Sequence, residues 1–497
     1  MGKPDSSTRA AMRIMVMFTL LVIICATSNA YARCVAHPGN RWLSIRAILL
    51  TGDIAPKQGT VLIDPSGTIR CVGRACSTQQ PNATRIDCPD ALLSPGFINL
   101  HEHLAFGNTA PAPDNGLRYR HRHDWRKGLN GYVALENFQP ETDPALIAWM
   151  ELRHLLGGET SIVGGSMAAG LARNLDFHAG LEGLQVPRVT YEVFPFDDAA
   201  GIERTGDCDY GPLADKTEAV AARHVTLMHL GEGISEAARN EFRCATDPHY
   251  DVQPPPAGGG VSQNLLLDNV TVLHGVAFDR AMLGELARRK VDLVWSPRSN
   301  LSLYGRTLDI NAALALGLTV SLGTDWLPSG SFTLGREAAC ARAYSDAAGS
   351  AVPFRTLWRM MTVNGAHAAH LAGRIGVLQP GAVGDVILVE QAKQRNRTPY
   401  EQVVRASAPS MLAIIRGGRI LAGGDALLAG LKGGGCERIR MGARTQRICI
   451  AGDSGFTYAA LQAKAASRKL WPAFFLDRPP VEPTCAALAG KSPSLGN

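Results

Sequence analysis

Between residues 93 and 375, short apolar runs of the kind that form β-strands alternate with helical patterns. Such alternation is typical of repeated βα units, whose strands lie parallel in one sheet. The 497 residues leave room for a (β/α)8 barrel, which takes about 250 residues, and for a smaller second domain. We therefore expect an α/β fold with strands at 96–100, 160–163, 188–193, 225–229, 270–274, 293–296 and 319–323.

Short β-type runs separated by turn residues also occur toward both ends of the chain. Those at 45–50, 61–63 and 68–72 predict a small antiparallel sheet, and those at 383–389 and 411–421 predict a strand followed by a hairpin. We predict that residues 33–92 and 376–430 form one composite β-sandwich domain around the barrel at 93–375. Residues 431–497, which contain Cys436, Cys449 and Cys485, are predicted to be an extension held by disulfides.

The N-terminus has the pattern of a secretory signal peptide. Lys3, Arg9 and Arg13 precede an apolar stretch at 14–26, and small residues at 28, 30 and 32 supply a cleavage pattern. Eleven cysteines are present, and removing Cys25 with the predicted signal (residues 1–32) leaves ten, an even number that fits disulfides. We expect a periplasmic or secreted protein without a stable membrane anchor.

Net charge gives little support to nucleic-acid binding. The value of +6 arises from 50 basic and 44 acidic residues spread along the chain, so no concentrated basic stripe is formed. The densest basic run lies between Arg118 and Lys127. A solvated loop is the favoured interpretation of this run, and a site for an anionic substrate is the alternative.

Several predicted strands end in a residue that can bind a metal ion or transfer a proton. His101 and His103 follow the first strand, and residues at i and i+2 of a strand share one face. His229 and His274 end two later strands, and Asp325 ends the last of them. Each residue alone also fits an ordinary core position. Active sites of α/β barrels gather where strands end, so the set together indicates a metal site.

The residues around these positions resemble the amidohydrolase superfamily over about residues 42–421. The resemblance is greatest to the branch that contains cytosine, guanine and S-adenosylhomocysteine deaminases and triazine hydrolases. It rests on four segments. Residues 93–103 include the two histidines, Pro297, Ser299 and Asn300 form a Pro-x-Ser-Asn turn, and Gly323, Thr324 and Asp325 form a Gly-Thr-Asp strand end. The return to the sheet domain is marked by residues 364–369, Gly376, Leu378, Pro380, Gly381, Gly384 and Asp385.

This resemblance implies a TIM-like barrel and a metal-dependent hydrolase of carbon–nitrogen bonds. It implies one divalent ion, zinc in the first place and iron or manganese as alternatives, with the ligands His101, His103, His229 and Asp325. Water would be oriented or deprotonated by His274 and would also lose a proton to Asp325, and Glu232 would act as the general acid. The substrate would be a small molecule, and a homodimer is an expectation from the family.

Four residues near strand ends are candidates for contact with substrate, with ordinary loop packing as the alternative: Arg298, Asn300, Trp326 and Ser329. No lysine stands at an apolar strand end to bridge a second metal ion, and Glu192 is the only substitute, so one metal ion is favoured. The family's fourth strand is not evident between Phe196 and Arg223. The alternatives are a cyclic-amide or dipeptide hydrolase, resembling imidazolonepropionase or prolidase, and a metal-binding barrel without turnover.

Overall fold

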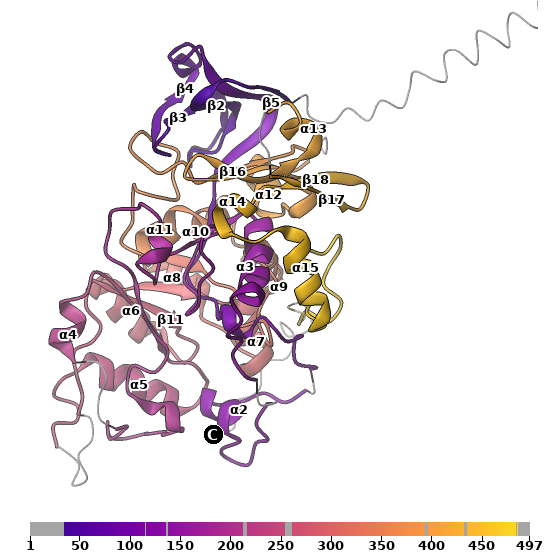
Figure 1. Ribbon diagram of the computed structural model, residues 1–497. Helices are drawn as coiled ribbons and strands as arrows, with labels where there is room; N and C mark the ends of the chain where they lie inside the picture. Colours follow the sequence, from indigo (N-terminus) through magenta and orange to yellow (C-terminus); the bar gives the residue numbers. More distant parts are fainter. Residues whose placement is uncertain are drawn as a thin grey trace, which may run out of the picture.

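The computed structural model describes residues 34–114, 116–135, 138–211, 216–253, 261–392, 396–431, 435–483 and 485. The predicted signal peptide lies outside these residues. Within them, helices are all too short or too polar to cross a membrane. Figure 1 shows a β-rich body formed by the two ends of the chain beside a larger α/β body formed by its middle.

Parallel strands in two sheets form the centre of the α/β body, as the alternating sequence pattern predicts. The three-stranded sheet has the order β6-β7-β8 and the five-stranded sheet the order β13-β12-β11-β10-β9. One backbone hydrogen bond spans each gap between them: Val189 N–H donates to Leu175 (2.9 Å), and Asp325 N–H donates to His101 (2.8 Å). The strands are β6 (Phe97–Asn99), β7 (Glu159–Ile162), β8 (Arg173–Asn174), β9 (Thr190–Glu192), β10 (Thr226–Leu230), β11 (Val270–His274), β12 (Asp292–Trp295) and β13 (Val320–Leu322).

The strand that the sequence pattern did not reveal is β8. It lies before β9, so β9 is the fourth parallel strand and no fourth strand is missing between Phe196 and Arg223. The described residues there form only short helices. Arg173 and Asn174, its two residues, are buried polar side chains that bond to Asp385 and Glu151. A two-residue polar strand has no apolar run, which explains why it could not be recognised.

Helices follow most of the parallel strands and begin with conventional N-caps. Asp143, Ser235 and Asp279 each accept a hydrogen bond from a backbone N–H of the first turn of the helix that follows. The α-helices are α2 (Arg122–Lys127), α3 (Pro144–Leu156), α4 (Thr217–Ala221), α5 (Glu236–Thr246), α6 (Arg280–Arg289), α7 (Pro297–Tyr304), α8 (Ile310–Ala315), α9 (Leu334–Ala347), α10 (Phe354–Met361), α11 (Val363–Ala368), α12 (Pro399–Val404), α13 (Asp425–Leu428), α14 (Ala451–Ser454) and α15 (Tyr458–Ser467).

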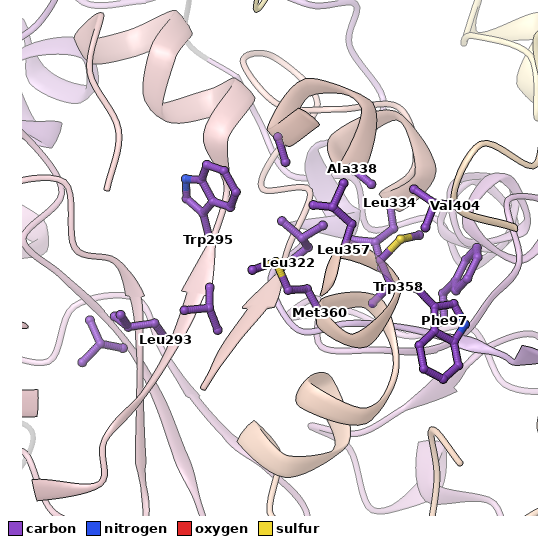
Figure 2. Packing of buried hydrophobic residues seen from close by; sticks show 14 of the residues in the cluster. Phe97, Leu293, Trp295, Leu322, Leu334, Ala338, Leu357, Trp358, Met360 and Val404 are labelled. Carbon is purple, nitrogen blue, oxygen red and sulfur yellow. The ribbon is translucent and has the colours of Figure 1, made fainter. Parts of the chain in front are cut away.

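The main hydrophobic core packs the helices against the outer faces of these strands. Trp295 of β12 and Trp358 of α10 are fully buried in it, with Leu293, Leu322 and Leu357 around them (Figure 2). The indole N–H of Trp358 donates to Ser94 Oγ at 2.8 Å, which joins the α/β body to the other body. This packing holds the strand ends, and therefore the side chains that follow them, in fixed positions.

Both ends of the chain pair in one ten-stranded sheet. Its order is β17-β18-β16-β15-β14-β5-β2-β3-β4, and β1 pairs with β5. The N-terminal part meets the C-terminal part where β5 and β14 run antiparallel, as the sequence predicts. The strands are β1 (Val35–His37), β2 (Asn40–Leu49), β3 (Lys57–Ile63), β4 (Ile69–Gly73), β5 (Ala83–Pro95), β14 (Val386–Val389), β15 (Met411–Arg416), β16 (Arg419–Gly424), β17 (Glu437–Met441) and β18 (Arg444–Ile448). The two layers of a sandwich stay a prediction.

The described residues after 430 contact both bodies of the structure. β17 and β18 extend the ten-stranded sheet, and Trp149 of α3 donates its indole N–H to Trp471 at 2.8 Å. All ten cysteines outside the predicted signal are paired: Cys34–Cys88, Cys71–Cys76, Cys208–Cys244, Cys340–Cys485 and Cys436–Cys449. Two of these disulfides hold the predicted extension, one to α9 and one within itself.

Candidate active site

The four side chains predicted as metal ligands converge where the parallel strands end. His229 Nε2 lies 3.2 Å from His101 Nε2 and 3.4 Å from His103 Nε2. Asp325 Oδ1 lies 3.4 Å from His101 Nε2 and 3.5 Å from His103 Nε2. In a tetrahedral zinc site with bonds of 2.0–2.1 Å, neighbouring donor atoms are about 3.3–3.4 Å apart. The donors are of the kind that zinc prefers, and four of the six donor–donor distances match this spacing.

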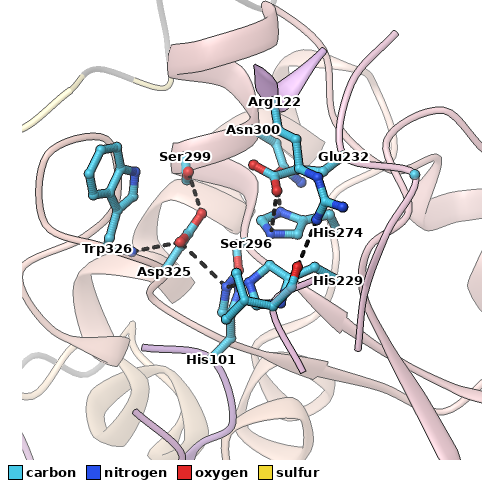
Figure 3. A network of polar contacts seen from close by, with 12 residues as sticks. His101, Arg122, His229, Glu232, His274, Ser296, Ser299, Asn300, Asp325 and Trp326 are labelled. Atoms are coloured by element: carbon cyan, nitrogen blue, oxygen red, sulfur yellow. Dashed lines mark hydrogen bonds and ion pairs between the residues drawn. The ribbon is translucent and has the colours of Figure 1, made fainter. Parts of the chain in front are cut away.

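Hydrogen bonds to the other ring nitrogens orient two of these imidazoles (Figure 3). His229 Nδ1 lies 3.0 Å from the carbonyl oxygen of Glu192 and His101 Nδ1 lies 2.9 Å from Ser296 Oγ. Because a carbonyl can only accept, His229 Nδ1 carries the proton and its Nε2 presents a lone pair. A hydrogen bond of this kind fixes the tautomer that a metal ligand needs.

The surroundings of the three histidines favour the neutral form of imidazole, which a metal ligand needs. Burial is the main cause that lowers the pKa of His101 and of His229 well below its ordinary value, and neighbouring histidines lower both pKa values further. Burial also lowers the pKa of His103, against the opposing effect of Asp325. Neutral imidazoles bind a cation without first having to lose a proton.

Asp325 is held by the chain on both carboxylate oxygens. Ser299 Oγ donates to Oδ2 at 2.5 Å, and the backbone N–H of Trp326 donates to Oδ1 at 2.7 Å. Asp325 has φ +57°, in the left-handed region, and His274 has φ +73°. Residues other than glycine seldom adopt such angles, and they concentrate at functional sites. Gly323 adds a close approach, since a Cβ there would lie 2.4 Å from His101 Cβ.

His274 and Glu232 face each other beside the ligand cluster. His274 Nδ1 lies 3.0 Å from Asn300 Oδ1, and the amide nitrogen of Asn300 donates to Thr307 at 3.1 Å, so the oxygen faces the imidazole. Nδ1 therefore carries a proton, and Nε2 lies 3.7 Å from Glu232 Oε2. This Nε2 is buried, and within the described chain it has no hydrogen-bond partner. The pair can accept and donate protons at one point of the site.

Tyr304 fixes the carboxylate of Glu232. Trp125 Nε1 donates to the Tyr304 hydroxyl oxygen at 2.8 Å, and that hydroxyl lies 2.7 Å from Glu232 Oε1. An indole N–H can only donate, so the hydroxyl proton of Tyr304 is directed to Glu232. Burial, together with the charge of Glu232, raises the pKa of Tyr304 well above its ordinary value. The phenol thus stays protonated and holds one carboxylate oxygen while the other faces His274.

A cavity of about 560 Å³ opens onto these groups. Its volume lies in the range of roughly 300–1,000 Å³ that is usual for small-molecule sites. Aromatic rings supply much of its wall, and Trp125 and Trp326 stack with ring centroids 4.9 Å apart. Besides site residues already described, the lining includes Phe106, Arg122, Arg126, Lys127, Ala134, Leu135, Phe138, Val193 and Phe194.

The structure separates the residues that were predicted to contact substrate. Trp326 lines the cavity. Arg298 does not line the cavity. Its side chain points away from the strand ends, so that the guanidinium donates to Ser331 Oγ at 2.6 Å and contacts the C-terminal segment. Asn300 contacts His274 and is not part of the wall. Ser329 bonds to Ser299 at 2.8 Å and thereby supports Asp325.

The basic run and Tyr304 are the main features that the sequence did not assign. The interpretation of 118–127 as a solvated loop is wrong for Arg122, which is buried in α2 and lies 2.5 Å from Asp198. Arg126 and Lys127 line the cavity. The run itself was the available signal for these cations, whereas nothing in the sequence marks Tyr304 as a partner of Glu232.

Residues 213–421 match the amidohydrolase family model. The chain contains an amidohydrolase domain. The matched part includes His229, Glu232, His274 and Asp325, and the structure adds His101 and His103 to the same site. The matched part is thus a domain of the amidohydrolase type, and the curated relatives reported next are named as deaminases.

Two curated relatives and one solved structure illustrate this branch. The chain is 30% identical over 187 residues to 5-methylthioadenosine/S-adenosylhomocysteine deaminase of Syntrophobacter fumaroxidans, covering 36% of this chain and 41% of the relative. It is 26% identical over 410 residues to 5'-deoxyadenosine deaminase of Methanosarcina mazei, covering 74% and 86%. Atrazine chlorohydrolase from Arthrobacter aurescens, complexed with zinc, superposes with a TM-score of 0.55 at 19% identity, covering 76% and 95%.

These likenesses differ in what they establish. The alignments with the first relatives span only about two fifths of their length (41% and 39%). The structural likeness, at 19% identity, establishes the fold alone, which is the mixed α/β, TIM-like architecture of amidohydrolases. The activity of the whole protein therefore has to be argued from the site.

Proposed function

We propose that this protein is an exported, metal-dependent amidohydrolase that removes the amino group from an amino-heterocycle by attack of water. The observation that carries the proposal is the cluster of His101, His103, His229 and Asp325, in which four donor–donor distances are 3.2–3.5 Å, beside the facing pair His274 and Glu232. A binding barrel without turnover would need the four ligands but not the facing pair. The deaminase names of the relatives support the choice of reaction over hydrolysis of a cyclic amide or a dipeptide.

The ligand set fits one divalent ion, zinc in the first place. His101, His103, His229 and Asp325 would hold it. Glu192, the candidate for bridging a second ion, has its side chain 3.5 Å from Arg223 Nη1, and its carbonyl orients His229. When bound, the ion supplies Lewis-acid activation of water near neutral pH.

The side chains supply the proton transfers of this reaction. The oxygen of water bonds to the ring carbon that carries the amino group, and Asp325 and His274 Nε2 are placed to accept a proton from that water. That proton passes to Glu232 Oε2, which faces His274, and Glu232 would donate it to the nitrogen as the carbon–nitrogen bond breaks. Over the whole reaction, one hydrogen of water reaches a ring nitrogen and the other leaves with ammonia, and a carbonyl remains on the ring.

The proposal extends to the architecture and the compartment. The two arcs of parallel strands would close as one (β/α)8 barrel, for which the hydrogen bonds at both gaps give support. The ten-stranded sheet would fold over as the small sandwich. Pairing of all ten cysteines outside residues 1–32 supports an oxidising compartment, as the signal pattern suggests.

Release of ammonia from a panel of amino-heterocycles tests the proposed reaction. The purified protein is reconstituted with zinc and assayed with adenosine, 5'-methylthioadenosine, cytosine, guanine and an aminotriazine, with a dipeptide and a cyclic amide as comparison substrates. We expect zinc-dependent ammonia release from at least one amino-heterocycle. Turnover of the dipeptide or the cyclic amide alone would replace the deaminase assignment by the alternative hydrolase.

Replacing Tyr304 by phenylalanine should lower kcat and leave KM little changed. The variant removes a hydrogen bond to a carboxylate, and we expect kcat to fall about 10- to 100-fold because Glu232 is no longer held toward His274. Steady-state kinetics and metal content together measure this effect. Tyr344→Phe, in α9 outside the cavity wall, is the matched control. An equal loss in both variants would contradict the role given to Tyr304.

Export predicts that the mature protein has no free thiols. We expect the protein recovered from the periplasm of an expression host to start near residue 31–33 and to resist alkylation until it is reduced. Intact mass spectrometry before and after reduction and alkylation measures both properties, since ten modifications should appear only after reduction. Free cysteines in the unreduced protein would count against the pairing.

A further inference from the structure

Helix α2 brings cationic side chains into the wall of the active-site cavity. Arg122, Arg126 and Lys127 all line it. The carboxylates in the same wall, Glu232 and Asp325, are already engaged with Tyr304 and with the ligand cluster. The charge of the wall therefore depends on whether each of the three cations has a partner of its own.

Arg122 is neutralised within the protein. Its Nη2 lies 2.5 Å from Asp198 Oδ2, its Nη1 donates to the carbonyl of Val193 at 2.8 Å, and both members of the ion pair are buried. His123 Nε2 lies 2.8 Å from the same carboxylate oxygen. A buried ion pair with such additional hydrogen bonds is part of the framework of the site. Arg122 is thus not available to a ligand.

Arg126 is oriented without being neutralised. Its guanidinium donates to His123 Nδ1 at 2.8 Å and to the carbonyl of Ala199 at 3.3 Å, and its Cζ lies 4.3 Å from the centroid of the Phe194 ring. These contacts use two of five N–H donors. Among the residues that the structure describes, no carboxylate forms an ion pair with Arg126 or with the exposed Lys127.

The cavity thus combines an aromatic wall, a candidate metal site and two cationic side chains that have no carboxylate partner among the described residues. Trp125 and Trp326 offer ring faces for a flat heterocycle, and Arg126 offers fixed N–H donors of the kind that bind carboxylate or phosphate. A ligand with a negative substituent would supply the missing counter-charge. A neutral heterocycle would leave Arg126 partly desolvated and without a partner, which is unfavourable.

We propose that the substrate is an amino-heterocycle that carries an anionic substituent, and that Arg126 and Lys127 bind this substituent. The inference rests on the proposed deaminase function and names its substrate class. The shared chemistry is an oxyanion group, either phosphate or carboxylate. Arg126 would fix its orientation by hydrogen bonds, and Lys127 at the exposed edge would contribute a charge that is screened by salt.

Matched pairs of substrates that differ in the anionic group test this inference. Adenosine is compared with adenosine 5'-monophosphate, and 5'-methylthioadenosine with S-adenosylhomocysteine, so that phosphate and carboxylate are examined separately. We expect kcat/KM at low salt to favour at least one charged member about 10-fold or more over its neutral counterpart. Raising the ionic strength from about 0.02 M to about 0.5 M should reduce this preference.

Arg126→Met should abolish the preference by raising KM for the charged substrate about 10- to 100-fold, with little change for the neutral one. Lys127→Met should also weaken the preference for the charged substrate, but by a smaller factor. Arg120→Met, an exposed arginine of the same basic run outside the cavity wall, is the matched control and should change nothing. If Arg126→Met does not fold, the effect of Lys127→Met and the salt dependence of the preference test the inference instead.

Binding without turnover separates this inference from the proposed function. Equilibrium dialysis of adenosine and its 5'-monophosphate is carried out on the metal-free protein. Tighter binding of the monophosphate, lost in Arg126→Met, would support the anionic subsite even if no ammonia were released. Deamination of neutral and charged partners at equal kcat/KM, unchanged by Arg126→Met, would overturn the inference and leave the deaminase function standing.

Discussion

Replacing Glu232 by glutamine should lower kcat by about 10²- to 10⁴-fold while the protein keeps its metal ion. Glutamine has nearly the same shape and can still bond to Tyr304, but it cannot donate a proton to the departing nitrogen. Glu232 lies 3.7 Å from His274 and is not among the groups of side chains that can share an ion. Single-turnover kinetics measure the loss of catalytic rate, and elemental analysis measures whether the metal ion is retained.

Glu236→Gln provides the control for this variant. Glu236 begins α5 four residues later, is exposed and pairs with Arg243, so its neutralisation should leave kcat within about twofold. Retained activity in Glu232→Gln would show that another group is the general acid. Loss of the metal ion in Glu232→Gln would instead make this carboxylate a ligand.

Replacing Asp325 by asparagine should reduce activity by at least about 10³-fold and weaken metal binding. The substitution removes the only charged ligand and a proton acceptor together. Asparagine tolerates the left-handed backbone that Asp325 adopts at φ +57°, so the backbone should stay in place. Activity with saturating zinc and the dissociation constant for zinc are the two measurements.

Asp346→Asn is the matched control for this second variant, because Asp346 is exposed and pairs with Arg342 on α9. It should keep full activity and full zinc affinity. Full zinc affinity in Asp325→Asn would contradict the role of Asp325 as a ligand. Activity close to that of the unaltered protein would contradict its part in the proton transfers.

The convergence of the ligands could be predicted from the sequence because each one follows a strand of a parallel sheet. Ends of parallel strands meet at one edge, so His101, His229, His274 and Asp325 are brought together although they are far apart in the chain. Apolar runs of four or five residues mark most of these strands. The fold could therefore be derived wherever a strand is marked by an apolar run.

Features that depend on packing alone could not be derived. The strand β8 consists of Arg173 and Asn174, whose burial is explained only by distant carboxylates. Arg298 comes three residues after the end of β12, but it lies on the first turn of α7 and points toward Ser331 instead of the cavity. Position in the sequence places a residue near a strand end, whereas its side-chain direction depends on the helix that begins there.

The active-site neighbours of Glu232 illustrate the same limit. Tyr304 is the last residue of α7, 72 positions from Glu232, and no sequence pattern joins the two. The cations of α2 were visible as a basic run. A run does not show that Arg122 forms an ion pair with Asp198, or that Arg126 has no carboxylate partner in the described part of the chain. Which charges remain available to a substrate is decided by tertiary contacts.

Metal content of the purified mature protein tests the central claim most directly. It is measured by elemental analysis for the unaltered protein and for a variant with His101→Ala and His103→Ala together, each checked for folding by circular dichroism. We predict about one equivalent of zinc or another divalent metal in the unaltered protein and almost none in the folded variant. An unaltered protein that is folded, supplied with zinc and still free of metal would contradict the account.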